Sequence, residues 1–154
     1  MKLLKFLLTV LGCLGVLGMG IKKGDGELPT SKHPYQEFVS RVGQFPYTAS
    51  EAKKQSIVTN YGRLVPGLAR EQELQILGEP DIETLLYTKY ARTRAKGFLG
   101  WSWTYFLFKL EPSGENLRQD KTVHVFFDTQ GCLQWVVPRN IEGLEEMGSP
   151  SPQM

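Results

Sequence analysis

The chain has 154 residues, enough for one domain with short extensions, and its 41% hydrophobic and 22% charged content is typical of a globular protein. Two of its 18 basic side chains, Lys2 and Lys5, lie in an apolar N-terminal segment, which leaves 16 basic against 16 acidic side chains. This balance argues against nucleic-acid binding, which depends on a positive surface. The two cysteines, Cys13 and Cys132, exclude a disulfide framework because Cys13 lies in the same segment.

Residues 1–20 have the pattern of an export signal. The basic start is followed by an uncharged run over residues 6–21, which as a helix is about 24 Å long and shorter than the ~30 Å bilayer core. A signal peptide therefore fits better than a permanent span. Three outcomes stay open: lipidation at Cys13, which follows a lipobox-like Val-Leu-Gly, soluble release after Gly20, or an uncleaved anchor. Polar residues 21–33 are predicted to be a flexible tether.

The first predicted helix follows Pro34. Four apolar residues occupy the i, i+3, i+4 and i+7 positions of one face, and Gly43 ends the run: Tyr35, Phe38, Val39 and Val42. A second helix is predicted over residues 48–62, opened by a capping box between Thr48 and Glu51.

A third helix is predicted over residues 69–77, after the break at Pro66-Gly67 and before Gly78 and Pro80. Its apolar residues are Leu74, Ile76 and Leu77, and its charged residues are expected to face solvent or a partner: Arg70, Glu71 and Glu73.

The second half of the chain has the alternation and aromatic content of β-strands, over residues 82–90, 101–110, 121–128 and 132–138. The second run is apolar on both faces and is therefore placed centrally. Residues 128–131 fit a hairpin turn with Gly131 in the left-handed conformation. We therefore predict an α+β fold for residues 34–140, a two-layer sandwich with the N-terminal helices packed on one face of a three- to four-stranded antiparallel β-meander. Residues 141–154 are predicted to be a disordered tail.

This pattern resembles the BamE/SmpA/OmlA family of small bacterial envelope lipoproteins, whose domains carry a Gly-Met-Thr segment, a helix ending in Leu-Gly-x-Pro, and strands ending in Phe-Asp-x-x-Gly-x-Leu/Val. The resemblance covers about 80 residues. Its matching residues are Gly67, Leu68, Leu74, Leu77, Gly78, Pro80, Phe127, Asp128, Gly131 and Leu133. Leu68 replaces the usual Met, and Ala69 replaces the usual Thr and so removes a helix N-cap. The chain is therefore expected to be a divergent relative.

The resemblance implies a non-catalytic accessory protein on the periplasmic face of the outer membrane, tethered by its N-terminal lipid or anchor. Its implied partners are envelope proteins, including the β-barrel assembly machinery, and its implied role is outer-membrane protein assembly or membrane integrity. The alternative is a soluble periplasmic or secreted inhibitor of the β-lactamase-inhibitor type. Soluble periplasmic or inner-membrane-anchored locations stay open.

No metal or cofactor site and no enzyme motif is predicted. His124 stands between two valines in a strand, where a hydrogen-bonded or solvent-facing histidine is more common than a base or metal ligand, and no HxxxH, CxxC or Gly-x-Ser-x-Gly arrangement occurs. Glu79, Asp81 and Glu83 form an acidic cluster that lacks the spaced oxygen ligands of a calcium loop, so turn chemistry is the preferred interpretation.

A basic run followed by aromatic residues is the candidate binding site. It contains Arg92, Arg94, Phe98 and Trp101. Basic and aromatic residues together suit either a protein hot spot or the boundary between lipid head groups and acyl chains. A solvated strand end whose aromatic residues turn into the core is the third interpretation.

Overall fold

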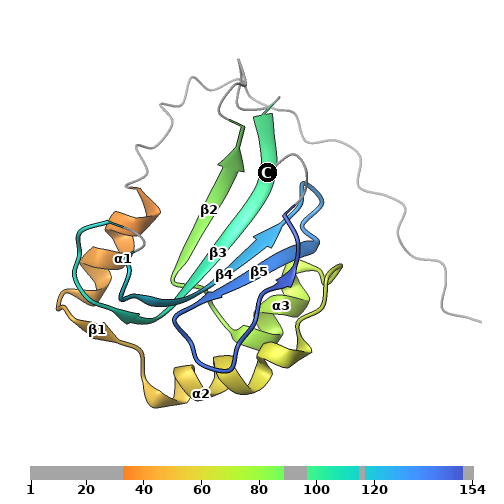
Figure 1. The fold of residues 1–154 in the computed structure, drawn as a ribbon. Helices are drawn as coiled ribbons and strands as arrows, with labels where there is room; N and C mark the ends of the chain where they lie inside the picture. The colour runs from red at the N-terminus through yellow and green to blue at the C-terminus, as the bar shows by residue number, and fades with distance from the viewer. Residues whose placement is uncertain (1–32, 89–96, 115–116, 151–154) are drawn as a thin grey trace, which may run out of the picture. The chain divides into compact units, whose positions relative to one another are not determined.

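A computed structural model describes residues 33–88, 97–114 and 117–150. These residues form three α-helices, a short 3₁₀ helix and a six-stranded antiparallel sheet (Figure 1). The predicted α+β class is confirmed. The predicted lipidation site, Cys13, lies outside the described residues.

The helices are α1 (Pro34–Val42), α2 (Glu51–Asn60), the 3₁₀ helix η1 (Tyr61–Arg63) and α3 (Arg70–Leu77). The first follows its predicted pattern, because Tyr35 and Phe38 are buried and Gly43 ends the helix at a φ of 71°. That left-handed conformation is one that glycine adopts without steric cost.

The predicted capping box of α2 is wrong, because the helix begins two residues later than its cap requires. The Ser50 hydroxyl accepts the backbone N–H of Lys53 at 3.2 Å, while Thr48 belongs to a strand. Ser and Thr are both good N-caps, so the sequence alone could not choose between them.

The strands are β1 (Tyr47–Thr48), β2 (Ile82–Tyr87), β3 (Phe98–Lys109), β4 (Lys121–Phe127), β5 (Leu133–Arg139) and β6 (Met147–Gly148). The sheet order is β1-β3-β4-β5-β6, and β2 also pairs with β3. The central position predicted for the second β-run is therefore confirmed. Along β3, β1 pairs near the end of the strand and β2 along its first half.

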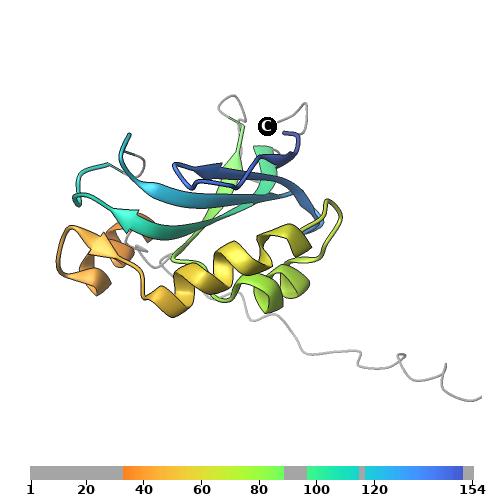
Figure 2. The same ribbon diagram turned by 60° about the horizontal axis from the view of Figure 1, so that its bottom comes forward.

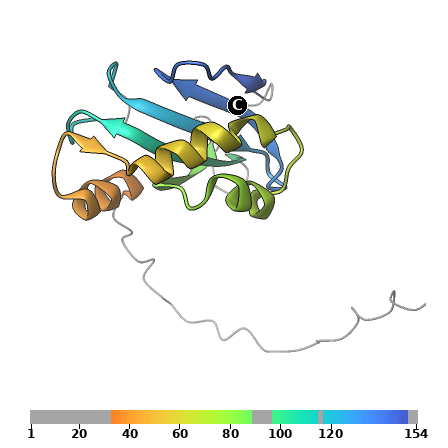
Figure 3. The same ribbon diagram turned by 90° about the horizontal axis from the view of Figure 1, so that it is seen from below.

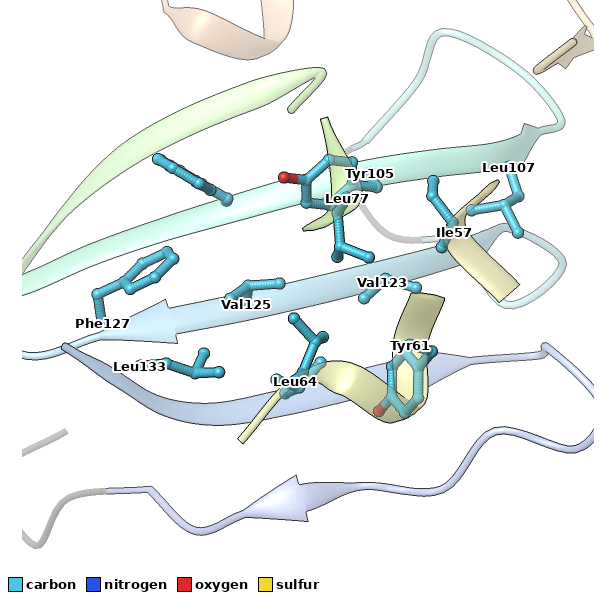
Figure 4. Packing of buried hydrophobic residues seen from close by; sticks show 12 residues of the cluster. Ile57, Tyr61, Leu64, Leu77, Tyr105, Leu107, Val123, Val125, Phe127 and Leu133 are labelled. Carbon is cyan, nitrogen blue, oxygen red and sulfur yellow. The ribbon is translucent and has the colours of Figure 1, made fainter. Parts of the chain in front are cut away.

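The main core lies between the sheet and the layer formed by α2, η1 and α3. Figures 2 and 3 show α2 and α3 along the same side of the sheet. Every second residue of the central strands points into this core (Figure 4). Its buried members are Ile57, Tyr61, Leu64, Leu77, Trp103, Tyr105, Leu107, Val123, Val125, Phe127, Leu133 and Val136.

Helix α1 belongs to a second, smaller cluster at the β2 side of β3. Phe38 stacks on Phe106 with ring centroids 4.6 Å apart, and Ile82 completes the contact. Phe106 alternates with Tyr105 along β3 and so points away from the main core.

Glu73 is the clearest exception to the sequence analysis. It was expected to face solvent or a partner, but it is fully buried in α3, where the Tyr105 hydroxyl lies 3.1 Å from Oε1 and 2.9 Å from the carbonyl oxygen of Gly78. Burial raises the pKa of Glu73 to about 8, and its hydrogen bond with Tyr105 opposes this rise. The helical period places residue 73 on the same face as Leu77, and this geometry prevails over the polarity of the side chain.

The predicted tail does not begin at residue 141. Ile141, Leu144 and Met147 pack against the main core, β6 pairs with β5, and the Tyr61 hydroxyl donates to the carbonyl oxygen of Glu145 at 2.6 Å. Glutamates and glycine separate these apolar residues in the sequence, so the local composition does not indicate that they pack against the core. Within the described ranges, no helix has the length and apolar character needed to cross a membrane.

Candidate partner-binding surface

The structure brings together two of the four predicted binding residues. Phe98 and Trp101 lie at the start of β3 with ring centroids 4.7 Å apart and planes at 82°. Tyr87, the last residue of β2, lies 5.8 Å from the Phe98 ring. Arg92 and Arg94 lie outside the described residues, so their part in the site remains a prediction from the sequence.

Arg70 is the residue that the predicted site lacked. Its side chain extends from the first turn of α3 across the sheet, and its guanidinium carbon lies 4.7 Å from the Trp101 ring centroid and 5.1 Å from that of Trp103. A guanidinium stacked on an indole face gains about 0.5–2 kcal/mol from the cation–π interaction. The side chain is 24% exposed, so part of it is reachable from solvent.

Glu83 fixes the orientation of this stack. One carboxylate oxygen, Oε2, accepts both Nη2 of Arg70 at 2.7 Å and the indole N–H of Trp103 at 2.6 Å. The ion pair and the two rings hold the guanidinium in place, and its buried Nε has no hydrogen-bond partner among the described residues. A side chain held in this way loses little further conformational entropy when a partner binds it.

The local chain path explains how Arg70 reaches the sheet. The N–H of Gly67 donates to the carbonyl oxygen of Leu133 at 2.7 Å, and the N–H of Arg70 donates to that of Gly131 at 3.1 Å. Gly131 has the predicted left-handed conformation, with a φ of 79°. A Cβ at this position would stand 3.3 Å from Cδ of Arg70, so glycine also leaves room for the arginine side chain.

We define the arginine–tryptophan surface as Arg70, Leu85, Tyr87, Phe98 and Trp101. Leu85 is 48% exposed and Tyr87 is 36% exposed, while the other three residues are partly exposed. Aromatic residues and arginine are enriched among the residues that contribute most to binding at protein interfaces. A single exposed apolar residue does not indicate a binding site. Here the exposed Leu85 and Tyr87 lie beside an arginine whose orientation is fixed, and this combination does indicate one.

His124 occupies a satisfied position in β4, as the sequence predicted. Its two ring nitrogens form hydrogen bonds with the hydroxyl groups of Thr104 at 3.1 Å and Thr122 at 3.0 Å. Burial lowers its pKa to about 4, and the nearby charge of Arg139 adds to this effect. The ring is therefore neutral near pH 7, with both nitrogens committed to threonines.

The acidic cluster has structural partners. Asp81 accepts the backbone N–H of Phe106 and the ammonium group of Lys53, each at 2.7 Å, and so joins α2 to β3 in the gap between β1 and β2. Glu83 holds the stacked arginine. These contacts link separate elements of the fold instead of satisfying backbone groups of a turn, so the turn-chemistry interpretation is wrong for Asp81 and Glu83. Among the described residues, no three His, Cys, Asp or Glu side chains are grouped to hold a metal ion.

A groove of about 490 Å³ lies away from this surface, near the end of β3. None of the predicted site residues lines it. Its lining consists of Thr48, Lys54, Val58, Leu107, Phe108, Gln119, Lys121, Ile141 and Glu142.

Comparison with curated proteins finds similarity to the outer membrane protein assembly factor BamE of Polynucleobacter necessarius subsp. necessarius (strain STIR1). The two sequences are 26% identical over 147 residues. The match covers 94% of this chain but only 55% of the relative, so the chain spans about half the length of that protein. No family model and no solved structure matches the chain. The comparison supports a distant, BamE-like relationship.

Proposed function

We propose that this chain is a non-catalytic accessory protein of a Gram-negative cell envelope that assists outer-membrane protein assembly. It binds envelope proteins, with the β-barrel assembly machinery as the partner, through the arginine–tryptophan surface. A lipid on Cys13 holds it at the periplasmic face of the outer membrane, and Arg92 and Arg94 add positive charge to the arginine–tryptophan surface.

The observation that carries this proposal is the stack of Arg70 on Trp101, fixed by Glu83 and flanked by Phe98. A partly exposed arginine that is already ordered, beside exposed apolar side chains, is better suited to holding a protein partner than to chemistry. The BamE name of the distant relative supports the choice of an assembly role.

Trp101→Ala is expected to weaken binding to solubilised barrel-assembly components by about 30-fold, the effect of losing a hot-spot residue worth ~2 kcal/mol. The matched control is Trp135→Ala. Trp135 is also partly buried, but it stacks on Phe126 at 4.8 Å on the other face of the sheet. Quantitative crosslinking in the envelope and recovery of folded outer-membrane proteins are the measurements.

Urea unfolding of both variants separates loss of binding from loss of fold. Equal binding by the Trp101 and Trp135 variants would contradict the assignment of the surface. Charge reversal at Arg92 and Arg94 tests the predicted basic contribution in a partner pull-down and in liposome binding. A loss confined to liposomes would assign the arginines to lipid, and no change in either assay would remove them from the site.

Intact-mass measurement of the processed protein tests the tether. We expect a diacyl or triacyl adduct on a chain that begins at Cys13, and its loss in Cys13→Ala. An unmodified chain beginning near Ile21 in the soluble fraction would overturn the lipid anchor and favour a released binder.

A further inference from the structure

The groove near the end of β3 contains a β-bulge. The register of β3 against β4 shifts between Phe106 and Phe108, which leaves Leu107 as an extra residue in β3. Successive side chains of a regular strand point to opposite faces, whereas a bulge bends the strand and can re-aim a side chain. As a result two consecutive residues, Leu107 and Phe108, both line the groove. Bulges are common next to functional sites, so this one directs attention to the groove.

Apolar side chains from three segments line the groove. Val58 of α2 is 40% exposed, whereas its neighbour Ile57 packs into the main core. Ile141, which follows β5, is partly buried against the same core. Figures 2 and 3 show the first turns of α2 beside the end of β3. With Phe108, these side chains form an apolar surface in a groove of about 490 Å³, a volume within the ~300–1,000 Å³ that is typical of small-molecule sites.

Two ammonium groups lie at the groove against one carboxylate. Lys121 is exposed, and its side chain takes part in none of the ion pairs or hydrogen bonds between described residues. Lys54 is paired at 2.7 Å with Glu51, but the Glu51 side chain is 89% exposed, and such surface pairs contribute little. Glu142 is the one carboxylate among the described residues that line the groove. The lining therefore carries a net positive charge.

We propose that this groove binds a small aliphatic monocarboxylate, with its hydrocarbon chain on the apolar lining and its carboxylate on Lys54 and Lys121. The inference goes beyond the proposed function and does not depend on it, because no residue of the arginine–tryptophan surface lines the groove. Size favours a small molecule over a protein, since nine residues line the groove and a standard protein interface takes about 20–30 residues from each partner. Charge favours a carboxylate, because hydrogen bonds between oppositely charged groups are stronger than those between neutral groups.

Isothermal titration calorimetry with three ligands of the same chain length tests the charge preference. Decanoate is expected to bind the protein at one molecule per chain. Decanamide, which is neutral, and decylammonium, which is cationic, should bind at least about tenfold more weakly. Equal affinities for decanoate and decanamide would overturn the proposal. Uptake of decanoate that does not saturate at one molecule per chain would also overturn it, because it would show adsorption without a defined site.

Val58→Glu tests the location of the site, with Thr59→Glu as its matched control. Both replace an exposed β-branched residue of α2 by a carboxylate, but Thr59 does not line the groove. We expect Val58→Glu to weaken decanoate binding at least about tenfold and Thr59→Glu to leave it unchanged. Urea unfolding of both variants checks that the fold is kept. If the two variants bind decanoate equally well, the ligand does not occupy the groove.

A second pair of variants tests the ammonium groups. Lys121→Gln and Arg139→Gln each remove one exposed positive charge, but Arg139 does not line the groove. The affinity for decanoate should fall about tenfold in Lys121→Gln and stay unchanged in Arg139→Gln, while Glu142→Gln should bind more tightly because it removes a repelling carboxylate. Equal weakening by the Lys121 and Arg139 variants would show a response to net charge alone and would contradict the proposal.

Methyl NMR of the wild-type protein gives an independent measurement. Decanoate should shift the methyl signals of Val58 and Ile141, which line the groove, and leave those of Leu85 on the arginine–tryptophan surface unchanged. Shifts at Leu85 without shifts at Val58 and Ile141 would place the ligand elsewhere and overturn the proposal.

Discussion

Asp120→Ala is expected to destabilise the fold by about 3–5 kcal/mol, because it leaves the ammonium group of Lys109 buried without its counter-ion. The two side chains are 0% and 2% exposed, and Nζ of Lys109 lies 2.7 Å from Oδ2 of Asp120. The same carboxylate accepts the backbone N–H groups of Leu110 and Leu117, at 3.0 and 2.8 Å. This one substitution therefore leaves a buried charge without its counter-ion. It also leaves two backbone N–H groups in the connection between β3 and β4 without an acceptor.

The matched control is Glu51→Ala, which breaks an ion pair of the same 2.7 Å length between Lys54 and a glutamate side chain that is 89% exposed. Its expected cost is at most about 1 kcal/mol. Urea unfolding of both variants is the measurement. The double variant Lys109→Met with Asp120→Ala should recover only part of the loss, because the two backbone N–H groups still lack an acceptor. Equal midpoints for Asp120→Ala and Glu51→Ala would contradict a structural role for the buried pair.

Local signals predicted most of the fold. The spacing of Phe38 and its neighbours, ended by Gly43, gave α1 its observed bounds to within one residue, and Gly131 adopts the left-handed turn conformation expected of it. Helical spacing and glycine positions predict structure only over a few neighbouring residues. The two-residue strands β1 and β6 have too few residues to show a period, and they form only because β3 and β5 offer them a pairing edge.

The candidate site was only partly predictable, for the same reason. Phe98 and Trp101 were found because they follow a basic run, but the contact between Arg70 and Trp101 joins residues far apart in sequence. Nothing near Arg70 distinguishes it from an ordinary charge in the first turn of a helix. A signal was present in Gly131, since a glycine with left-handed φ also permits close approach by another segment, but its neighbour can be identified only in three dimensions.

Glu73 should make the protein less stable as the pH rises. Its folded pKa is about 8 against an ordinary value of 4.5, so the folded state keeps a proton that the unfolded state has lost. A protonated Glu73 can donate to the Tyr105 oxygen, which leaves the single Tyr105 hydroxyl hydrogen for the carbonyl oxygen of Gly78. Stability from this group is complete below about pH 4.5 and is lost as the pH rises toward 8.

The window between pH 6.5 and 8 isolates this effect. His124 acts in the opposite direction, because its pKa is lowered from 6.5 to about 4, but its contribution is complete above pH 6.5. Across the window the unfolding free energy should fall by roughly 1–2 kcal/mol, with the steepest slope near pH 6.5 and about half that slope near pH 8. Glu73→Gln, which reproduces the protonated carboxyl with an amide donor, should remove this slope and be the more stable protein at pH 8. Urea unfolding at several pH values is the measurement, and parallel profiles for the two proteins would show that Glu73 is already ionised in the fold.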